Sequence, residues 1–230
     1  MKVMLLAAGR GERMRPLTDA TPKPLLLVAG KPIIVHTLDK LRKAGFNDIV
    51  INLAHLGEQI VSHLGDGLQF GVNISYSNEG EEGLETAGGI VNALPLLGEQ
   101  PFIVVNGDIA TDFPFASLRN RTIDLAHLVL VDNPEHHRQG DFGLDDRMNV
   151  VDDSSIKFTF SGIGVYHPDL FDKVPPGKSK LAPLLRQAIN TQRVSGEKYN
   201  GFWMDIGTPQ RLQELDHYYQ RGMHHDQPYL

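Results

Sequence analysis

Short apolar runs alternate with amphipathic stretches along the first half of the chain. Apolar runs bounded by polar residues, glycine or proline predict buried strands, and apolar residues three to four positions apart predict helices. The predicted strands are 2–6, 48–52, 73–76 and 102–106, and the predicted helices are 34–45, 57–64 and 86–94. A strand and a helix repeated about every 25 residues are typical of parallel βαβ units, with helices on both faces of the sheet.

The second half of the chain has a more mixed pattern. Strands are predicted at 125–131 and 158–166, and an apolar stripe at helical spacing predicts a helix over 181–189. A last helix is expected to begin with Thr208 as its N-cap. Because no internal repeat or linker interrupts the pattern, we expect one α/β domain over residues 1–221. We expect it to be a Rossmann-like, mostly parallel open sheet, followed by a flexible tail at 222–230.

Two helix ends can be predicted from local residues. Thr86 is a suitable N-cap for the helix after the Gly/Glu-rich loop 78–85. Pro95 disfavours helical geometry at Leu94 and is therefore expected to end the same helix. Gly88 and Gly89, near its start, would let a ligand approach the backbone.

The segment Ala7-Ala8-Gly9-Arg10-Gly11 follows the first strand and so lies at the edge of an open α/β sheet where ligands bind. Small residues let a ligand approach the backbone, whose N–H groups suit phosphate oxygens. The segment lacks the third glycine of the dinucleotide fingerprint and the Gly-Lys-Ser/Thr ending of a P-loop. A bare Gly-x-Gly sequence is also compatible with an ordinary structural turn.

Lys23 stands between Pro22 and Pro24. A residue before proline is pushed towards extended geometry, so we expect Thr21 and Lys23 to be extended and no helix to form there. A lysine presented on a stiff backbone suits a phosphate group. The alternative is a surface lysine in a proline-rich loop.

Two acids are candidates for a divalent cation site. Asp108 follows the strand that ends at Asn106, and Asp205 stands just before the last helix. Either acid alone could be a turn residue. Beside a basic segment, the two carboxylates together suit Mg²⁺, which takes carboxylate and phosphate oxygens.

Composition and charge narrow the functional classes. The 230 residues include no cysteine, which excludes disulfides, thiolate zinc sites and a cysteine nucleophile. The net charge of −6 argues against nucleic-acid binding, yet residues 1–31 hold six cations and only two anions. An acidic protein with one basic segment suggests a local anion site. The early apolar run is too short for a signal peptide or a membrane span, so we expect a cytoplasmic protein.

The sequence LAAGRGERMRPLTDATPKPLL resembles the signature of the sugar nucleotidyltransferases, which join a nucleoside triphosphate to a sugar 1-phosphate. NGD and WMDIGT resemble the metal-binding motifs of that family, and LETAGG resembles the loop that closes over base and sugar. The resemblance implies a GT-A-like fold, Arg13 and Lys23 at the reacting phosphates, and Mg²⁺ on Asp108 and Asp205.

The same resemblance implies two groups of substrate-binding residues. Those expected at the nucleotide are Ala7, Ala8, Gly9, Arg10, Gly11, Glu12, Arg13, Lys23, Glu85, Thr86, Gly88 and Asn106. Those expected at the sugar are Asn106, Asp141, Gly88 and Ser161. For Asp141 there is also a physical reason, because it follows a turn-rich stretch that would bring it towards the edge holding Asp108. It could equally be a plain turn residue.

Further segments carry a narrower resemblance within the family. VDNPEHHRQGDF, FSGIGVYHP, KLAPLLRQAI and GFWMDIGTPQRL resemble members that use UTP and N-acetylmuramic acid α-1-phosphate in peptidoglycan recycling. The alternatives are a mannose-1-phosphate guanylyltransferase, a glucose-1-phosphate thymidylyltransferase and a phosphocholine cytidylyltransferase. A non-catalytic regulatory module that binds nucleotide sugars is the alternative from another class. The sequence does not indicate an oligomeric state.

Overall fold

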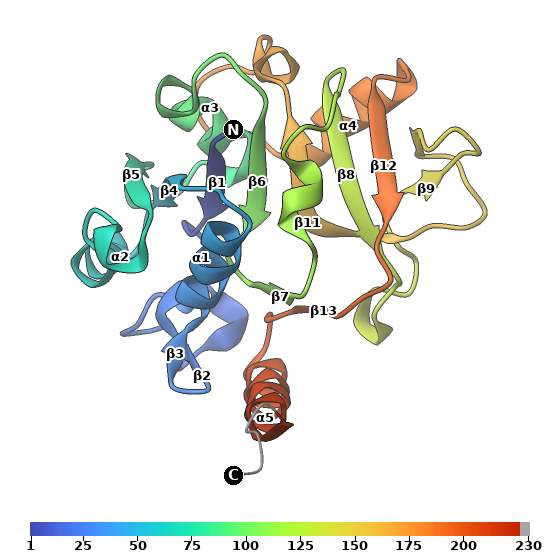
Figure 1. Ribbon diagram of the computed structural model, residues 1–230. Coiled ribbons are helices and arrows are strands. Elements are labelled where there is room, and N and C mark those ends of the chain that lie inside the picture. The colour runs from blue at the N-terminus through green and yellow to red at the C-terminus, as the bar shows by residue number, and fades with distance from the viewer. Residues whose placement is uncertain (226–230) are drawn as a thin grey trace.

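A seven-stranded sheet forms the centre of the computed structural model, which describes the backbone of residues 1–225 and the side chains of residues 1–221 (Figure 1). From edge to edge its strands are β12 (Val194–Lys198), β8 (Ala126–Val131), β11 (Thr159–Tyr166), β6 (Phe102–Asn106), β1 (Val3–Leu6), β4 (Asp48–Leu53) and β5 (Asn73–Asn78). Neighbours from β6 to β5 are parallel, whereas β11 is antiparallel to both β6 and β8. The predicted mostly parallel α/β sheet with a mixed second half is confirmed.

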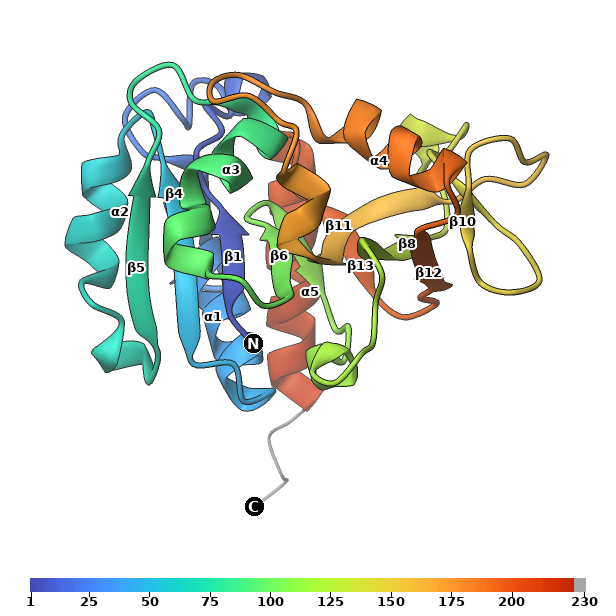
Figure 2. The same cartoon turned by 90° about the horizontal axis from the view of Figure 1, so that it is seen from above.

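Helices cover both faces of this sheet, as Figure 2 shows. α1 (Ile33–Lys43) and α2 (Gly57–Leu64) pack on one face, where Leu38 and Ile60 join the buried side chains of β1 and β4. α3 (Glu85–Leu97) and α4 (Leu181–Asn190) pack on the other face, through residues such as Ile90 and Leu185. The central strand β1 therefore has apolar side chains on both sides, which explains its unbroken apolar run.

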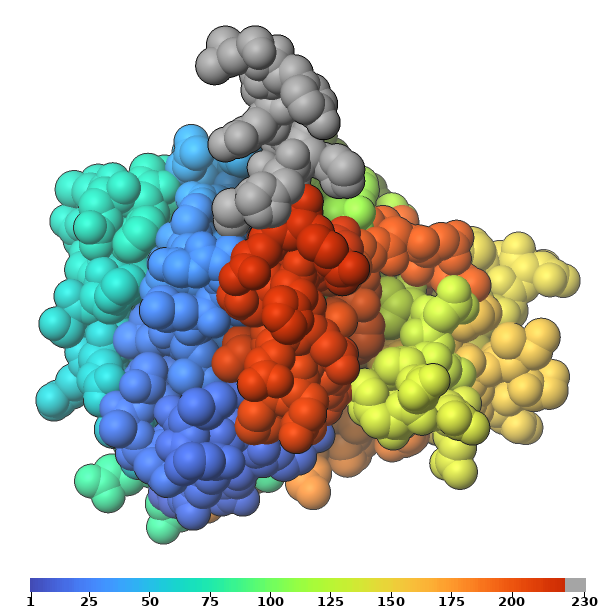
Figure 3. All heavy atoms as spheres, turned by 90° about the horizontal axis from the view of Figure 1, so that it is seen from below, coloured from blue at the N-terminus to red at the C-terminus, as the bar shows by residue number. Residues whose placement is uncertain are grey.

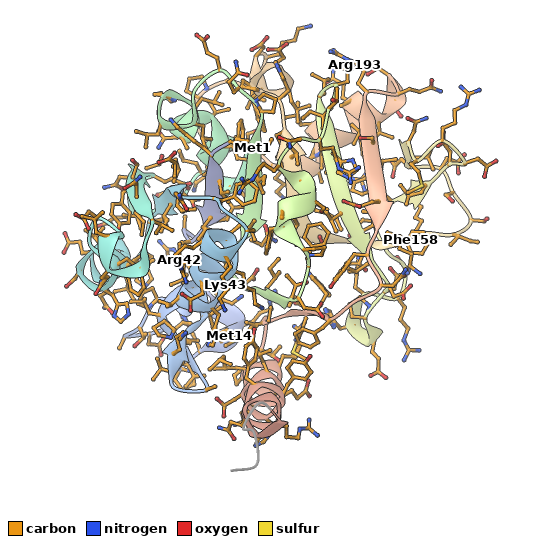
Figure 4. All side chains as sticks on the ribbon, in the orientation of Figure 1. Met1, Met14, Arg42, Lys43, Phe158 and Arg193 are labelled. Carbon is orange, nitrogen blue, oxygen red and sulfur yellow. The ribbon has the colours of Figure 1, made fainter. Side chains whose placement is uncertain are left out.

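α5 (Pro209–His225) lies across the underside, between the N-terminal segment and the second half of the chain (Figure 3). Its Leu215 joins a small core cluster with Met14 and Ile206. Met14, labelled in Figure 4, is fully buried in this cluster, which ties the loop after β1 to the end of the chain. Thr208 caps α5 as predicted, since its hydroxyl accepts a hydrogen bond from the Arg211 N–H at 3.3 Å.

Short elements complete the chain. The short strands pair as β2 (Leu27–Val28) with β3 (Lys31–Pro32), β7 (Ile109–Thr111) with β13 (Trp203–Asp205), and β9 (Gly143–Leu144) with β10 (Val150–Val151). The 3₁₀ turns are η1 (Glu12–Met14), η2 (Lys23–Leu25), η3 (Leu68–Phe70), η4 (Phe115–Leu118), η5 (Glu135–His137) and η6 (Pro168–Phe171). Within residues 1–225, no helix is long and apolar enough to cross a membrane.

Two expectations about element ends were wrong. α3 runs through Pro95 to Leu97, because Leu97 is buried in the core and the Gly98 N–H closes the helix on the Leu94 carbonyl at 2.8 Å. Thr86 is inside α3, and the N-cap position belongs to Leu84, which makes no side-chain cap. The flexible tail expected at 222–230 stays a prediction, since α5 is described as far as His225 and residues 226–230 lie outside the described residues.

Candidate active site

The carboxyl ends of β4, β1 and β6 meet at one edge of the sheet and begin the candidate site. Leu6 at the end of β1 stands in register with Asn52 on one side and Asn106 on the other. The Ala7 N–H donates to Asn52 Oδ1 at 2.7 Å, which fixes the start of the following loop. Gly107 has its Cα against the Leu6 carbonyl, where a Cβ would collide with that oxygen. The backbone is therefore drawn in tightly at the floor of the site.

The glycine loop, residues 7–11, turns away from β1 over this floor. Gly9 has no other atom within 4 Å of the position that a Cβ would take, so its backbone is open to a ligand. Gly11 has a φ of 65°, a left-handed conformation that favours glycine, and it begins the η1 turn. Its carbonyl accepts a hydrogen bond from the Thr18 hydroxyl at 2.8 Å, which holds the turn against the next segment. The loop is therefore held in place at both ends, and its backbone at Gly9 is accessible to a ligand.

Lys23 lies beneath this loop and is only 8% exposed. Its Nζ forms an ion pair with Asp108 Oδ2 at 2.6 Å, so an element near the N-terminus meets the end of β6. The expectation that Lys23 is extended was wrong, since it begins the 3₁₀ turn η2 after an extended Pro22. The Leu26 N–H closes that turn on the Lys23 carbonyl at 3.1 Å, which offsets the bias of a following proline.

The two candidate metal ligands come together although they are far apart in the sequence. β13 pairs with β7 so that Asp205 stands opposite Ile109, and the Ile206 N–H donates to the Asp108 carbonyl at 2.7 Å. The Asp205 carboxylate is ion-paired with Arg211 and lies 3.1 Å from His136 Nε2. Each acid therefore has a cation beside it.

The donor set of this pair is compatible with Mg²⁺. Asp108 and Asp205 supply hard carboxylate oxygens from adjoining backbone positions. Among the side chains described, no cluster of three or more acids and histidines could hold a metal by itself. Mg²⁺ bound by one or two carboxylates takes its other ligands from phosphate oxygens and water, so two acids are sufficient.

Arg13 is the second predicted cation at the site, and Gly207 brings it close to Asp205. A Cβ on Gly207 would lie 3.2 Å from an Arg13 guanidinium nitrogen and 3.1 Å from Asp205 Oδ2. The absence of a side chain at Gly207 thus leaves room for Arg13 and Asp205 on either side of one backbone position. Of the two cations predicted from the N-terminal segment, Lys23 forms an ion pair with Asp108, and Arg13 lies near Asp205 across Gly207.

Most of these residues line a cleft with a volume of about 710 Å³, whose lining includes Gly207 but, among the described residues, not Asp205. That volume is in the range of about 300–1,000 Å³ that small-molecule sites occupy. The predicted nucleotide-site residues that line it are Ala7, Ala8, Gly9, Arg10, Gly11, Glu12, Arg13, Lys23, Glu85, Thr86 and Asn106, together with Asp108. Glu85 has a φ of 60°, unusual for a residue other than glycine and typical of strain at functional sites.

A second pocket of about 320 Å³ continues from this cleft, and we call it the side pocket. Leu6, Glu85, Thr86 and Asn106 line both cavities, so the two share a wall. Asp141 lines only the side pocket, where its Oδ2 accepts the Phe160 N–H at 2.8 Å. Asp108 lines only the cleft, so Asp141 and Asp108 lie in adjoining cavities and the role of Asp141 at the sugar stays a prediction.

Two predicted substrate residues lie elsewhere. Gly88 is buried inside α3 against the Gly177 carbonyl, so its missing side chain serves close packing within the protein rather than approach of a ligand. Ser161 is 1% exposed, and its hydroxyl donates to the Val129 carbonyl at 2.7 Å. Ser161 lies where the pairing of β11 with β8 shifts register, and its hydrogen bond joins the two strands at this irregularity.

Several residues at the site were missed by the sequence reasoning. Asn52 donates to Glu79 Oε1 at 2.6 Å, and Glu79 Oε2 accepts the Leu84 N–H at 2.7 Å, which joins β4 to the loop before α3. Asn52 lies at the end of a predicted strand, as Asn106 does. That position is the feature of the sequence that could have indicated Asn52 as a site residue. Lys178 reaches the same loop from the far wall, pairing with Glu82 at 2.7 Å and lowering the pKa of that carboxyl.

The family model for nucleotidyl transferases matches residues 2–222 of this chain. The chain belongs to the nucleotidyl transferase family. It is 54% identical over 228 residues to an N-acetylmuramate alpha-1-phosphate uridylyltransferase of Neisseria meningitidis serogroup B, a match that covers 93% of this chain and 96% of that protein. It is 35% identical to a protein of the same name from Caulobacter vibrioides, over 90% of this chain and 92% of that one.

Solved structures of nucleotidyl transferases share the fold. A putative glucose-1-phosphate thymidylyltransferase from Bacillus anthracis superimposes with a TM-score of 0.83, covering 100% of this chain and 97% of that one at 23% identity. At that identity the likeness supports the fold alone. The predicted family, the Rossmann-like fold and the assignment as a sugar-1-phosphate nucleotidyltransferase enzyme are confirmed by these comparisons.

Proposed function

We propose that the protein transfers UMP from UTP to N-acetylmuramic acid α-1-phosphate, giving UDP-N-acetylmuramic acid and pyrophosphate. The observation that carries this proposal is the 54% identity, over nearly the whole of both chains, to a protein named for that reaction. The geometry agrees, because a large cleft with phosphate-binding features adjoins a smaller pocket of a size suited to a sugar. We place the triphosphate in the cleft and the sugar in the side pocket.

In this arrangement the glycine loop supplies backbone N–H groups to the phosphate oxygens. Arg13 and Lys23 neutralise the charge of the triphosphate at the reacting α-phosphorus. Lys23 can exchange Asp108 for a phosphate oxygen with a small movement, because its ammonium group already borders the cleft. Glu85 and Thr86, on the wall between the two cavities, stand where nucleotide and sugar would meet.

Asp108 and Asp205 are the residues that would hold Mg²⁺. The ion would neutralise phosphate charge and stabilise the leaving pyrophosphate. Asp108 could bind the ion only if Lys23 moved from Asp108 towards the nucleotide. Asp205 could bind it only if the ion pair between Arg211 and Asp205 were partly broken. The cations beside the two acids thus hold them in place before substrates arrive.

The reaction itself asks for little chemistry beyond positioning. An oxygen of the sugar phosphate attacks the α-phosphorus of UTP, a new P–O bond forms, and the bond to the β-phosphate oxygen breaks, with its electrons leaving on pyrophosphate. The attacking oxygen is already anionic at neutral pH, so no general base is required. The main barrier is the approach of two anions, which charge neutralisation and in-line placement reduce.

The alternative substrates have weaker support. A guanylyl-, thymidylyl- or cytidylyltransferase would use the same cleft, but 54% identity over 96% of an N-acetylmuramate enzyme favours uridylyl transfer. A non-catalytic binding module is disfavoured because Lys23, Asp108 and Asp205 are all present. N-acetylmuramic acid is a peptidoglycan sugar, so we also propose that the enzyme acts in cell-wall recycling in the cytoplasm.

A direct experiment is to incubate the purified protein with UTP, Mg²⁺ and N-acetylmuramic acid α-1-phosphate. We expect equimolar pyrophosphate and UDP-N-acetylmuramic acid, with the sugar nucleotide identified by its mass. Absence of both products, in protein shown to be folded, would contradict the proposal.

A further inference from the structure

The side pocket has an unusual distribution of charge for a site that binds a neutral sugar ring. Its lining includes two acids, Glu85 and Asp141, and two cations, Lys180 and Arg186. Carboxylates accept hydrogen bonds from hydroxyls and suit any sugar. Cations gain little from hydroxyl groups, so their presence indicates that the substrate brings a negative charge besides its phosphate.

N-acetylmuramic acid has such a charge, the carboxylate of the lactyl ether on its ring. Asp141 would repel this carboxylate, so the lactyl group must lie against another part of the lining. The two cations come from a later segment of the chain, Lys180 just before α4 and Arg186 on it. The side pocket therefore offers carboxylates to the ring hydroxyls and cations to an acid.

The two cations differ in what they already contact. Arg186 Nε donates to Asp152 at 3.0 Å, and its guanidinium lies 5.8 Å from the centre of the Phe142 ring. Lys180 is exposed, and among the described side chains no carboxylate lies within ion-pair distance of it. Its ammonium group is the one that a substrate carboxylate can take without displacing a partner.

We propose that Lys180 binds the lactyl carboxylate and makes the enzyme select a sugar acid over neutral sugar 1-phosphates. The start of α4 supports this, because Leu181 and Ala182 line the same pocket and the helix has no side-chain N-cap. The positive end of the helix dipole adds to the field of the lysine. The proposal rests on the proposed function, since it assigns one group of that substrate to one residue.

The test is a double-mutant cycle between Lys180 and the lactyl carboxylate. The substrates are N-acetylmuramic acid α-1-phosphate and the same compound with its lactyl acid converted to the amide, which removes the charge and nearly keeps the size and shape. For the wild type we expect kcat/KM to be about tenfold higher for the acid, the effect of one hydrogen bond to a charged group. For Lys180→Met this ratio should fall to about one, and Lys180→Arg should restore most of it.

Lys173→Met is the matched control, because Lys173 is an exposed lysine of the same loop that lines neither cavity. It should keep the wild-type ratio. An acid-to-amide ratio near ten in Lys180→Met, or near one in the wild type, would overturn the proposal. If the wild type turned over neither compound, the proposed function itself would fail, and the inference with it. A wild type that is active but shows no coupling would refute the inference alone.

Discussion

Replacing Lys23 by methionine tests whether one buried cation, rather than the charge of the whole N-terminal segment, acts on the triphosphate. Lys23 and Lys31 are both lysines of that segment, and each is paired with an aspartate, at 2.6 and 2.7 Å respectively. They differ in burial, because the side chain of Lys23 is 10% exposed and that of Lys31 is 45% exposed. Lys31 does not line the cleft, so Lys31→Met is a matched control.

The expected loss follows from the position of the ammonium group at the floor of the cleft. Removing one preorganised electrostatic group of an active site typically lowers turnover by about 10²–10³-fold, or roughly 3–4 kcal/mol. We expect a loss of that size for Lys23→Met. Exposed ion pairs contribute about 0–1 kcal/mol to stability, and Lys31 touches no substrate, so Lys31→Met should retain turnover within about twofold.

Stability must be measured alongside activity, because Lys23→Met leaves the partly exposed Asp108 without its partner. We expect a cost of about 1–2 kcal/mol, which lowers the Tm of a chain of this size by roughly 2–8 °C. Methionine keeps the buried aliphatic stem packed, so the fold should persist. The assay is pyrophosphate release at saturating UTP, with thermal unfolding followed in parallel. Equal losses of turnover in the two variants would contradict a specific role of Lys23 and show that the segment acts through diffuse charge.

Three further predictions concern other groups. Asp108→Asn and Asp205→Asn should each lower turnover by about 10²-fold or more with the fold intact. Excess chelator should abolish the activity of the wild type, and full activity in chelator would rule out a metal requirement. Asp141→Asn should raise the KM for the sugar phosphate and leave UTP binding, measured by calorimetry, nearly unchanged; a matching loss of UTP affinity would place Asp141 outside the sugar site. His36 on α1 is half-buried, and this burial lowers its pKa below the usual 6.5, so its neutral form stabilises the fold above that pH and the contribution is lost as pH falls. The Tm advantage of wild type over His36→Gln should therefore shrink from pH 7.5 to pH 5, and an advantage that grew on acidification would be inconsistent with a buried neutral imidazole.

The sequence predicts six of the seven strands of the central sheet, because strands such as β1, β6 and β8 are buried on both faces and thus apparent as apolar runs. The partly exposed edge strand β12 has no such run and was not predicted. Polar residues at the ends of those runs indicate the ligand edge, and Asn106 and Asp108 were found in this way. The same signal exists for Asn52, but no motif accompanies it. Its role is visible only when the Ala7 N–H and Glu79 are seen to meet at its side chain.

Other features depend on tertiary contacts that local patterns do not encode. The helix α3 continues through Pro95 because Leu97 is buried in the core. Thr86 does not cap α3 because the N-cap position is at Leu84. Gly88 was interpreted as a ligand contact, but a small residue at a close approach looks the same in sequence whether the neighbour is a ligand or the Gly177 carbonyl. Arg211, in the first turn of α5, forms an ion pair with Asp205 at the end of β13, a contact that only the structure places at the site.

Competition among substrates in one reaction vessel shows which nucleotide and which sugar phosphate the enzyme prefers. Equal concentrations of UTP, GTP, dTTP and CTP are offered with equal concentrations of N-acetylmuramic acid, mannose and glucose 1-phosphates and phosphocholine, and the products are separated by mass. Under competition the product ratio reports relative kcat/KM. We expect UDP-N-acetylmuramic acid to exceed every other product. GDP-mannose as the main product would contradict the assignment and leave only the reaction class.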